Sequence, residues 1–119
     1  IQSHGHTHAR LGRLSPEDVK KEIVDSQRLL SEMTGEPVRW IAYPKGSFRK
    51  EMIPVLEENG FRGACSVIRD NRVRADQMFW LPRVMVMRSI SLRYFHYYFS
   101  RLYHLVHQRK NRKRWGELA

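Results

Sequence analysis

The sequence contains little cysteine, no long apolar run and no internal repeat. Its single cysteine, Cys65, excludes an internal disulfide framework. No apolar stretch approaches the roughly 20 residues that a membrane-spanning helix needs, and no signal-peptide pattern is present. With 119 residues, 41% of them hydrophobic, the chain is long enough for one domain with an ordinary core.

Acidic residues are also scarce in the C-terminal third. From Gln77 onward nine lysines and arginines accompany a single acid, Glu117, so this segment carries +8 of the formal net charge of +10. The residues before it are nearly balanced in charge. We therefore expect charge-driven interactions to involve the C-terminal tail.

Helical and extended patterns alternate along the first two thirds of the chain. Ser15 and Pro16 are typical of a helix start, and Gly35 of a helix end, which predicts a helix over 16–34. Val19, Ile23, Leu30 and Met33 lie at helical spacing and predict its buried face.

Short apolar segments on either side of the helical patterns predict strands. They cover 1–3, 38–42 and 61–67, and a second helix is expected over 49–59, with Pro54 in its first turn or at a kink. The stretch 79–87 is expected to be extended. Strands that alternate with helices over short connections indicate an α/β fold with a parallel sheet.

A different pattern follows this α/β part. Apolar residues step by three and four along a segment that ends in "QRKNRKRW", which predicts an amphipathic C-terminal helix. We therefore divide the chain into an α/β domain over 1–88 and a basic amphipathic helix or tail over 89–119. Residues 89–114 are suited to an anionic membrane surface. Nucleic acid is a weaker candidate because no nucleic-acid fold motif accompanies the charge.

Three histidines lie within five residues at the end of the first predicted strand. In parallel α/β folds ligands bind beyond the carboxyl ends of the strands, where these histidines and the "YPKGS" loop are both expected. Neutral imidazoles bind zinc, and His4/His8, His4/His6 and His6/His8 are all possible pairs. Gly5 occupies the position of the glutamate in a His-Glu-x-x-His motif, which excludes that class of metalloprotease.

Two segments resemble motifs of the polysaccharide deacetylase (NodB-homology, carbohydrate esterase family 4-like) domain. "SHGHTHARLGRLSPEDVKKEI" is similar to its serine and His-x-x-x-His motif with the following helix. "IAYPKGSFRKEMIPVLEENGFRGACSV" is similar to its Tyr-Pro-x-Gly motif, and "LPRV" to a segment downstream. The resemblance covers roughly residues 1–86 and implies a partial distorted (β/α) barrel that removes N-acetyl groups from an amino-sugar polymer or glycan.

The resemblance also implies roles for individual residues. His4 and His8 would ligate a divalent metal, usually zinc, and His6 between them would be a bystander. Tyr43 and Pro44 would line the sugar groove. Arg83 is assigned to substrate binding, with a position on the surface as the alternative. The resemblance implies a location in the cell envelope or outside the cytoplasm.

The sequence departs from the family pattern at several positions. The family's first motif, an Asp-Asp pair that supplies the base and third ligand, is absent and is expected upstream of Ile1. The chain starts without methionine, so we expect it to be one piece of a longer protein. The general acid is unassigned among His96, His104 and His107. We therefore expect a hydrolase in the parent protein and no activity of these 119 residues alone. The alternatives are a non-catalytic binding module with a basic tail and, less favoured, a metallohydrolase that uses a close His-x-His pair.

Overall fold

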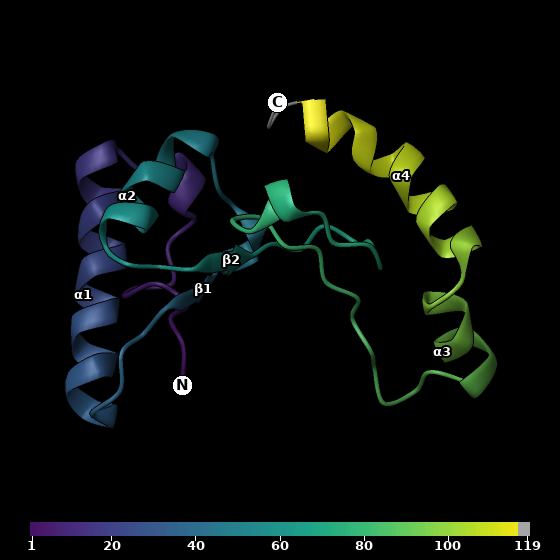
Figure 1. Ribbon diagram of the computed structural model, residues 1–119, viewed down its shortest axis with the longest axis horizontal. Coiled ribbons are helices and arrows are strands. Elements are labelled where there is room, and N and C mark those ends of the chain that lie inside the picture. The colour runs from purple at the N-terminus through teal and green to yellow at the C-terminus, as the bar shows by residue number, and fades with distance from the viewer. Residues whose placement is uncertain (117–119) are drawn as a thin grey trace.

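The first helix, α1 (Pro16–Thr34), begins and ends where the sequence predicts. Figure 1 shows this computed structural model, which describes residues 1–116 without the side chains of 109, 110 and 112–116. The Ser15 hydroxyl accepts a hydrogen bond from the Asp18 amide at 3.1 Å, which caps one of the free N–H groups of the first turn. Gly35 ends the helix with a φ of 69°, a conformation that favours glycine.

The buried face of α1 is only partly apolar. Val19 and Ile23 are almost fully buried, and Leu30 packs against the same core. Met33, predicted on this face, is 81% exposed, so that part of the prediction is wrong. It belongs to the last turn of the helix. A charged residue, Glu22, is buried beside Ile23, and its partners are described with the site.

Four short segments run parallel in the order in which they occur along the chain. The two central segments, β1 (Trp40–Ala42) and β2 (Gly63–Cys65), form a parallel pair. Isolated parallel bridges join Ser3 to β1 and Leu81 to β2. The predicted parallel α/β fold is therefore confirmed, although each paired region is shorter than its apolar run in the sequence.

The connection between β1 and β2 contains a short helix. A turn of 3-10 helix over Lys50–Met52 leads into α2 (Ile53–Glu58). Pro54 lies in the first turn of α2, where its missing N–H leaves no hydrogen bond unmade. Gly60, with a φ of 75°, follows the helix and returns the chain to the sheet.

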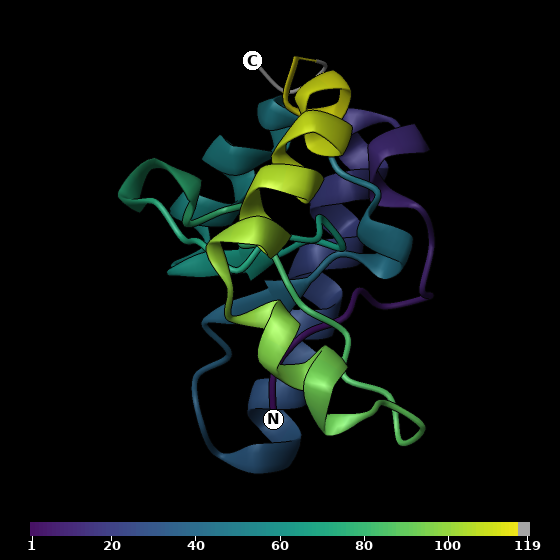
Figure 2. The ribbon, with the colours of Figure 1, turned by 90° about the vertical axis from the view of Figure 1, so that its right-hand side faces the viewer.

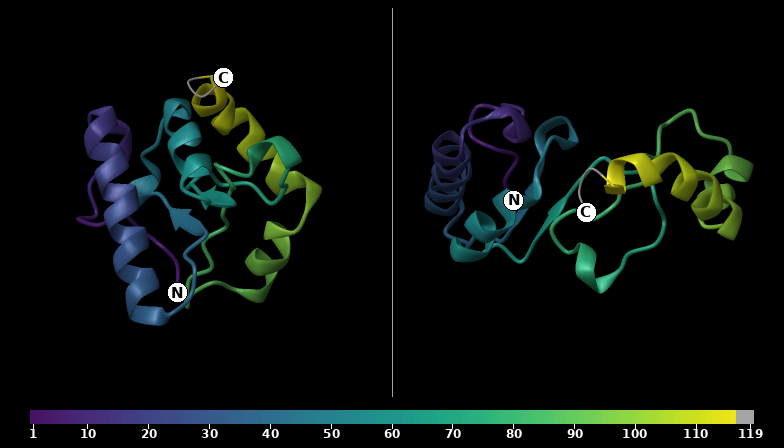
Figure 3. Two further views of the ribbon diagram at one scale, coloured as in Figure 1. Left: turned by 60° about the vertical axis from the view of Figure 1, so that its left-hand side comes forward. Right: turned by 90° about the horizontal axis from the view of Figure 1, so that it is seen from above.

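Helices lie on both sides of the strands. Figure 1 and the right-hand view of Figure 3 show α1 and α2 together on one side, and the helices that follow residue 90 on the other. The core occupies the space between the first two helices and the strands. Its most deeply buried members are Leu11, Val19, Ile23, Ile41, Tyr43 and Leu56.

The C-terminal segment forms two helices in place of the single predicted one, α3 (Leu92–Tyr98) and α4 (Arg101–Gly116) (Figure 2). The Ser100 hydroxyl accepts the Tyr103 amide at 3.2 Å, which is a helix-start contact and explains the break. The predicted apolar face is largely exposed in the structure: Leu92 is 70%, Phe99 73% and Leu102 59% exposed. Within the described residues, no helix combines the length and apolar character needed to cross a bilayer.

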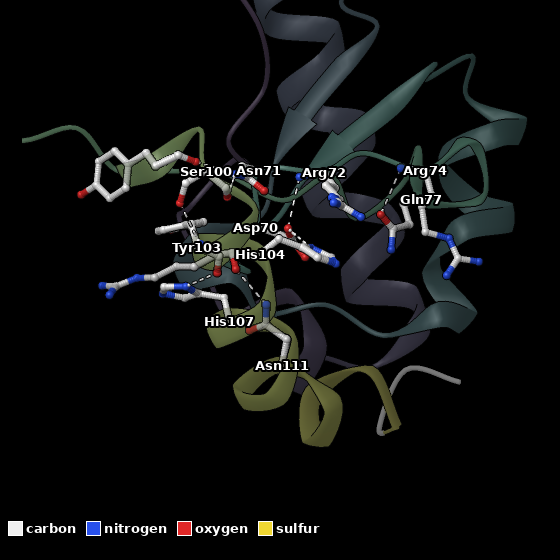
Figure 4. Close-up of polar contacts among 12 residues, drawn as sticks. Asp70, Asn71, Arg72, Arg74, Gln77, Ser100, Tyr103, His104, His107 and Asn111 are labelled. Atoms are coloured by element: carbon white, nitrogen blue, oxygen red, sulfur yellow. Dashed lines mark hydrogen bonds and ion pairs between the residues drawn. The ribbon is translucent and has the colours of Figure 1, made fainter. Parts of the chain in front are cut away.

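Polar contacts connect α4 to the loop after β2 (Figure 4). His104 Nδ1 lies 2.8 Å from a carboxylate oxygen of Asp70, and both side chains are largely buried. The Asn111 amide donates to the Arg69 carbonyl at 2.8 Å. Asn71 donates to two backbone carbonyls where α3 meets α4. These side chains hold α4 in place although most of its apolar residues face outward.

Candidate functional site

The first histidine of the cluster is oriented by the sheet. Ser3 is bonded to β1 through its own N–H and C=O groups, so His4 leaves the sheet at its carboxyl edge. His4 Nδ1 lies 2.5 Å from the Ala42 carbonyl oxygen. A carbonyl only accepts, so Nδ1 carries a hydrogen, and in the neutral ring Nε2 is then the nitrogen with the free lone pair. Such an Nδ1–H···O=C contact is a common orienting contact of a metal-binding histidine.

The structure brings His4 and His8 together. Their ring centroids lie 4.9 Å apart with the planes tilted by 59°, and both residues are exposed. The loop between them turns through two residues with positive φ, Gly5 at 79° and His8 at 62°. A histidine with positive φ is uncommon, which shows that surrounding contacts hold this loop in an unfavoured conformation.

Glu22 on α1 supplies those contacts. One carboxylate oxygen accepts the backbone N–H groups of His6 and Thr7, both at 2.9 Å, and the other accepts the Thr7 hydroxyl at 2.5 Å. Burial alone would raise the pKa of Glu22. The hydrogen bonds from Thr7 and His6 outweigh burial and lower it below its ordinary value.

Sequence reasoning missed Glu22, although a signal for it exists. It lies three residues after Val19 and next to Ile23, on the face that the spacing of apolar residues predicts to be buried. A carboxylate on such a face needs partners because an unpaired buried charge is costly.

The serine before the histidines is also structural. Its hydroxyl lies 2.6 Å from that of Ser26 on α1, and both residues are buried. The same Ser3 oxygen accepts the Gly5 amide at 3.3 Å. Ser3 therefore links the sheet, the first helix and the start of the loop from His4 to His8, which we call the histidine loop.

Tyr43 and Pro44, the residues predicted to line a groove, are both buried in the structure. Tyr43 is 0% exposed, its ring stacks on Phe48 with centroids 4.6 Å apart, and its hydroxyl donates to the Phe79 carbonyl at 2.8 Å. Burial, with a smaller contribution from Cys65, raises the pKa of Tyr43 above its ordinary value. Both side chains are buried, Pro44 lies close to Gly5, and a contact of either residue with a sugar stays a prediction.

Arg83 is the one exposed residue of the predicted substrate set. It follows the bridge at Leu81, and its Nε donates to the Ser66 carbonyl at 2.6 Å. Ser66 follows the end of β2, so Arg83 lies near the same carboxyl edge of the sheet as the histidine loop. Cys65 is a partly buried residue at the end of β2.

The two histidines are suitable ligands for a divalent metal, but two ligands do not complete a metal site. Imidazole nitrogens suit zinc, and the pair presents two of them on an exposed loop. No group of three or more His, Cys, Asp or Glu side chains that could hold an ion occurs among the described residues. His104 and His107 are engaged elsewhere, with Asp70 and with the Tyr103 carbonyl.

The same fold occurs in solved deacetylase structures. The chain superimposes on the Streptococcus pyogenes deacetylase PplD, solved in complex with acetate, with a TM-score of 0.76 and 19% identity, covering 83% of this chain and 44% of that one. A polysaccharide deacetylase of Bacillus cereus gives a TM-score of 0.70 at 22% identity, covering 84% of this chain and 32% of that one. These likenesses place the fold among the deacetylases.

The sequence then places the chain in a family. The family model for polysaccharide deacetylase matches residues 1–64, more than half of the chain, and the chain belongs to this family. The Bacillus subtilis protein YxkH, a polysaccharide deacetylase by its name, is 29% identical over 91 residues, which are 76% of this chain and 33% of that protein. The chain thus spans about a third of the length of this curated relative.

Proposed function

We propose that the parent protein is a metal-dependent hydrolase that removes N-acetyl groups from an amino-sugar polymer or glycan. Family membership supports the reaction class, and the pairing of His4 with His8 supports the metal. The single observation that carries the proposal is the His4 ring, held by its Nδ1–H on the Ala42 carbonyl so that Nε2 faces away from that bond.

Zinc is the metal that this donor set favours, and His4 and His8 would hold it. When bound, such an ion lowers the pKa of a water molecule and polarises a carbonyl group. Other residues of this chain orient the two proposed ligands. The carbonyl of Ala42 orients the His4 ring, and Glu22 holds the loop that bears His8. The described residues contain no group of three His, Cys, Asp or Glu side chains that could hold the ion, and we propose that the 119 residues alone are inactive.

We also propose that the four parallel segments form an arc of a distorted (β/α) barrel. Their order along the sheet follows their order along the chain, as in consecutive barrel strands. Arg83, exposed near the carboxyl edge, is the residue of this arc proposed to contact the glycan. An extracytoplasmic location in the cell envelope accompanies this substrate class as part of the same proposal.

Zinc titration of the chain and three histidine variants tests the proposal. His4→Ala and His8→Ala should each abolish zinc binding, measured by calorimetry, whereas His6→Ala should bind like the wild type because it keeps the backbone N–H that donates to Glu22. Equal losses in all three variants would assign a different ligand set that includes His6. Acetate release from an N-acetylglucosamine oligomer by the 119-residue chain would refute its inactivity.

A second candidate function is association with an anionic membrane surface through residues 89–114. Leu92, Phe99 and Leu102 are exposed on α3 and α4, and every charged residue from 77 to 116 is basic. The side chains of the basic residues at 109, 110 and 112–114 lie outside the described residues. The chain should bind phosphatidylserine vesicles and not phosphatidylcholine vesicles. Binding to neither would exclude a membrane, and salt-sensitive binding to duplex DNA instead would favour nucleic acid.

A further inference from the structure

We propose that Glu22 is a positioning residue that sets the approach of His4 and His8 through the backbone of the loop between them. The inference rests on the proposed function, in which these two rings share an ion. It concerns a residue on α1 that lies outside the histidine motif and does not contact either imidazole in the structure.

The hydrogen bonds of Glu22 are confined to the middle of the loop. Its two oxygens accept three hydrogen bonds, from the His6 amide, the Thr7 amide and the Thr7 hydroxyl. Each bond involves a residue between the two proposed ligands. Because Glu22 is 8% exposed, water cannot readily replace these partners, and the carboxylate gives the loop a fixed charged anchor.

The backbone of the loop explains why an anchor is needed. His8 has a φ of 62°, which a residue with a Cβ atom adopts only when other contacts compensate. The His4 contact with Ala42 anchors one end of the loop, and the Glu22 bonds at positions 6 and 7 anchor its middle, next to the bond from the Gly5 amide to the Ser3 hydroxyl. The first fixes one ring, and the second fixes the peptide units that lead to the other.

Packing around Gly5 completes the arrangement. A Cβ atom built on Gly5 would lie 3.3 Å from a Glu22 carboxylate oxygen and 3.5 Å from the Pro44 ring. The loop therefore passes between the α1 carboxylate and the buried Pro44. The buried Pro44 thus lies next to the loop at Gly5, and with Glu22 it leaves little room for a side chain there.

Both Glu22 oxygens bind loop donors, and no group of three His, Cys, Asp or Glu side chains that could hold an ion occurs among the described residues, so Glu22 is not placed as a third ligand in this conformation. Its effect on a bound ion would act through loop geometry. Residues that orient metal ligands in this indirect way typically change metal affinity by about 10–100-fold when replaced.

Two substitutions distinguish the effect of the hydrogen-bond acceptors of Glu22 from the effect of its side-chain volume. Glu22→Met keeps an unbranched side chain with good helix propensity and removes all three acceptor contacts. Glu22→Gln can keep them, because its carbonyl oxygen can accept both amides while its NH₂ donates to the Thr7 hydroxyl. The matched control is Glu17→Met, an exposed position in the first turn of the same helix.

The first measurement uses the 119-residue chain without metal. In NMR spectra of the wild type we expect a cross-relaxation signal between the His4 and His8 rings and slowed exchange of the His6 and Thr7 amides. Glu22→Met should lose both, whereas Glu22→Gln and Glu17→Met should retain them. A Glu22→Met chain that keeps the ring contact and the slowed exchange would overturn the proposal, as would an equal loss in Glu17→Met.

A zinc titration of the same variants then tests the consequence. Glu22→Met should bind zinc about 10–100-fold more weakly than the wild type, and Glu22→Gln should stay close to it. Unchanged affinity in Glu22→Met would overturn the positioning role. If the wild type takes up no zinc while Glu22→Met still loses the ring contact, the proposed metal function fails and the positioning of the two rings stands.

Thr7→Val provides a second test of the proposal if Glu22→Met does not fold. It removes one of the three hydrogen bonds and leaves α1 unchanged, and Thr7 is exposed. Faster exchange of the Thr7 amide and a smaller loss of zinc affinity would support the proposal. Wild-type values for both would overturn it.

Discussion

Tyr43→Phe tests whether the tyrosine of the "YPKGS" loop is structural, because it removes a single oxygen atom. The ring can remain fully buried and stacked on Phe48, 4.6 Å between centroids. What is lost is the 2.8 Å hydrogen bond to the Phe79 carbonyl. Phe79 lies two residues before the bridge at Leu81, so this bond ties the fourth parallel segment to the end of β1.

The expected destabilisation follows from that one bond. A neutral hydrogen bond contributes about 0.5–1.5 kcal/mol net, and a buried carbonyl left without a partner can raise the loss toward about 3 kcal/mol. We therefore expect the free energy of unfolding to fall by about 1–2 kcal/mol. For a chain of this size each kcal/mol corresponds to a drop of roughly 3–6 °C in Tm.

The free energy of unfolding should also depend on Tyr43 at alkaline pH. Burial raises the pKa of Tyr43 in the folded chain above its ordinary value of 10.0. A group with a raised folded pKa contributes stability that is fully present below the unfolded pKa and is lost as the pH rises above it. The wild type should therefore lose stability more steeply above pH 10 than Tyr43→Phe does.

Urea denaturation followed by fluorescence measures both effects, with Tyr94→Phe as the control because Tyr94 is 54% exposed. An unchanged unfolding midpoint in Tyr43→Phe at neutral pH would refute the structural role of the hydroxyl. Weaker binding of an N-acetylglucosamine oligomer at unchanged stability would instead return Tyr43 to the sugar groove.

Three further substitutions test other parts of the structure. Gly63→Ala would place a Cβ atom 2.7 Å from the Met78 carbonyl oxygen, so unfolding should become easier by about 1–3 kcal/mol, measured with urea. The lowered pKa of Glu22 provides stability above its ordinary value of 4.5 that is lost as the pH falls, so Glu22→Gln should flatten acid denaturation between about pH 6 and pH 3. His104→Ala leaves buried Asp70 without its ring partner and should cost about 1–3 kcal/mol, with faster amide exchange in α4 but not α1.

Each of these predictions has a control in the same chain. At Gly60 the φ of 75° disfavours a side chain even in open space, so Gly60→Ala measures backbone strain without crowding; an unchanged unfolding midpoint in Gly63→Ala, which has no positive φ, would contradict the steric reasoning. Glu57→Gln, on the exposed end of α2, should leave acid denaturation unchanged. Equal exchange in α1 and α4 of His104→Ala would show that the histidine supports the whole fold and not the docking of α4.

Local signals in the sequence were sufficient for α1 and for the class of fold. Ser15, Pro16 and Gly35 act through contacts within a few residues, and the structure has the helix ends where these residues predict them. The family was likewise recognisable from the order and spacing of the motifs, which the family model over residues 1–64 confirms. The membrane surface, the metal and the sugar contacts remain predictions.

The C-terminal helix shows where a local pattern is insufficient. Apolar residues at helical spacing predicted one amphipathic helix, yet Ser100 caps a second helix and interrupts it. The helical spacing of apolar residues predicts which residues share a face of the helix, but it does not predict what packs against that face. In the structure Asp70, Asn71 and Asn111 hold the segment with polar contacts, and these join residues far apart along the chain.

The sequence by itself determined the ends of α1, the alternation of strands and helices in the α/β part and the histidine-rich loop, because each depends on residues close together in the chain. Only the tertiary structure decided that Tyr43 is buried, that Glu22 binds the loop and that the rings of His4 and His8 meet. The physical reason is that a buried polar group must find its partner wherever the fold supplies one, and the Glu22 partner lies 15 residues away along the chain.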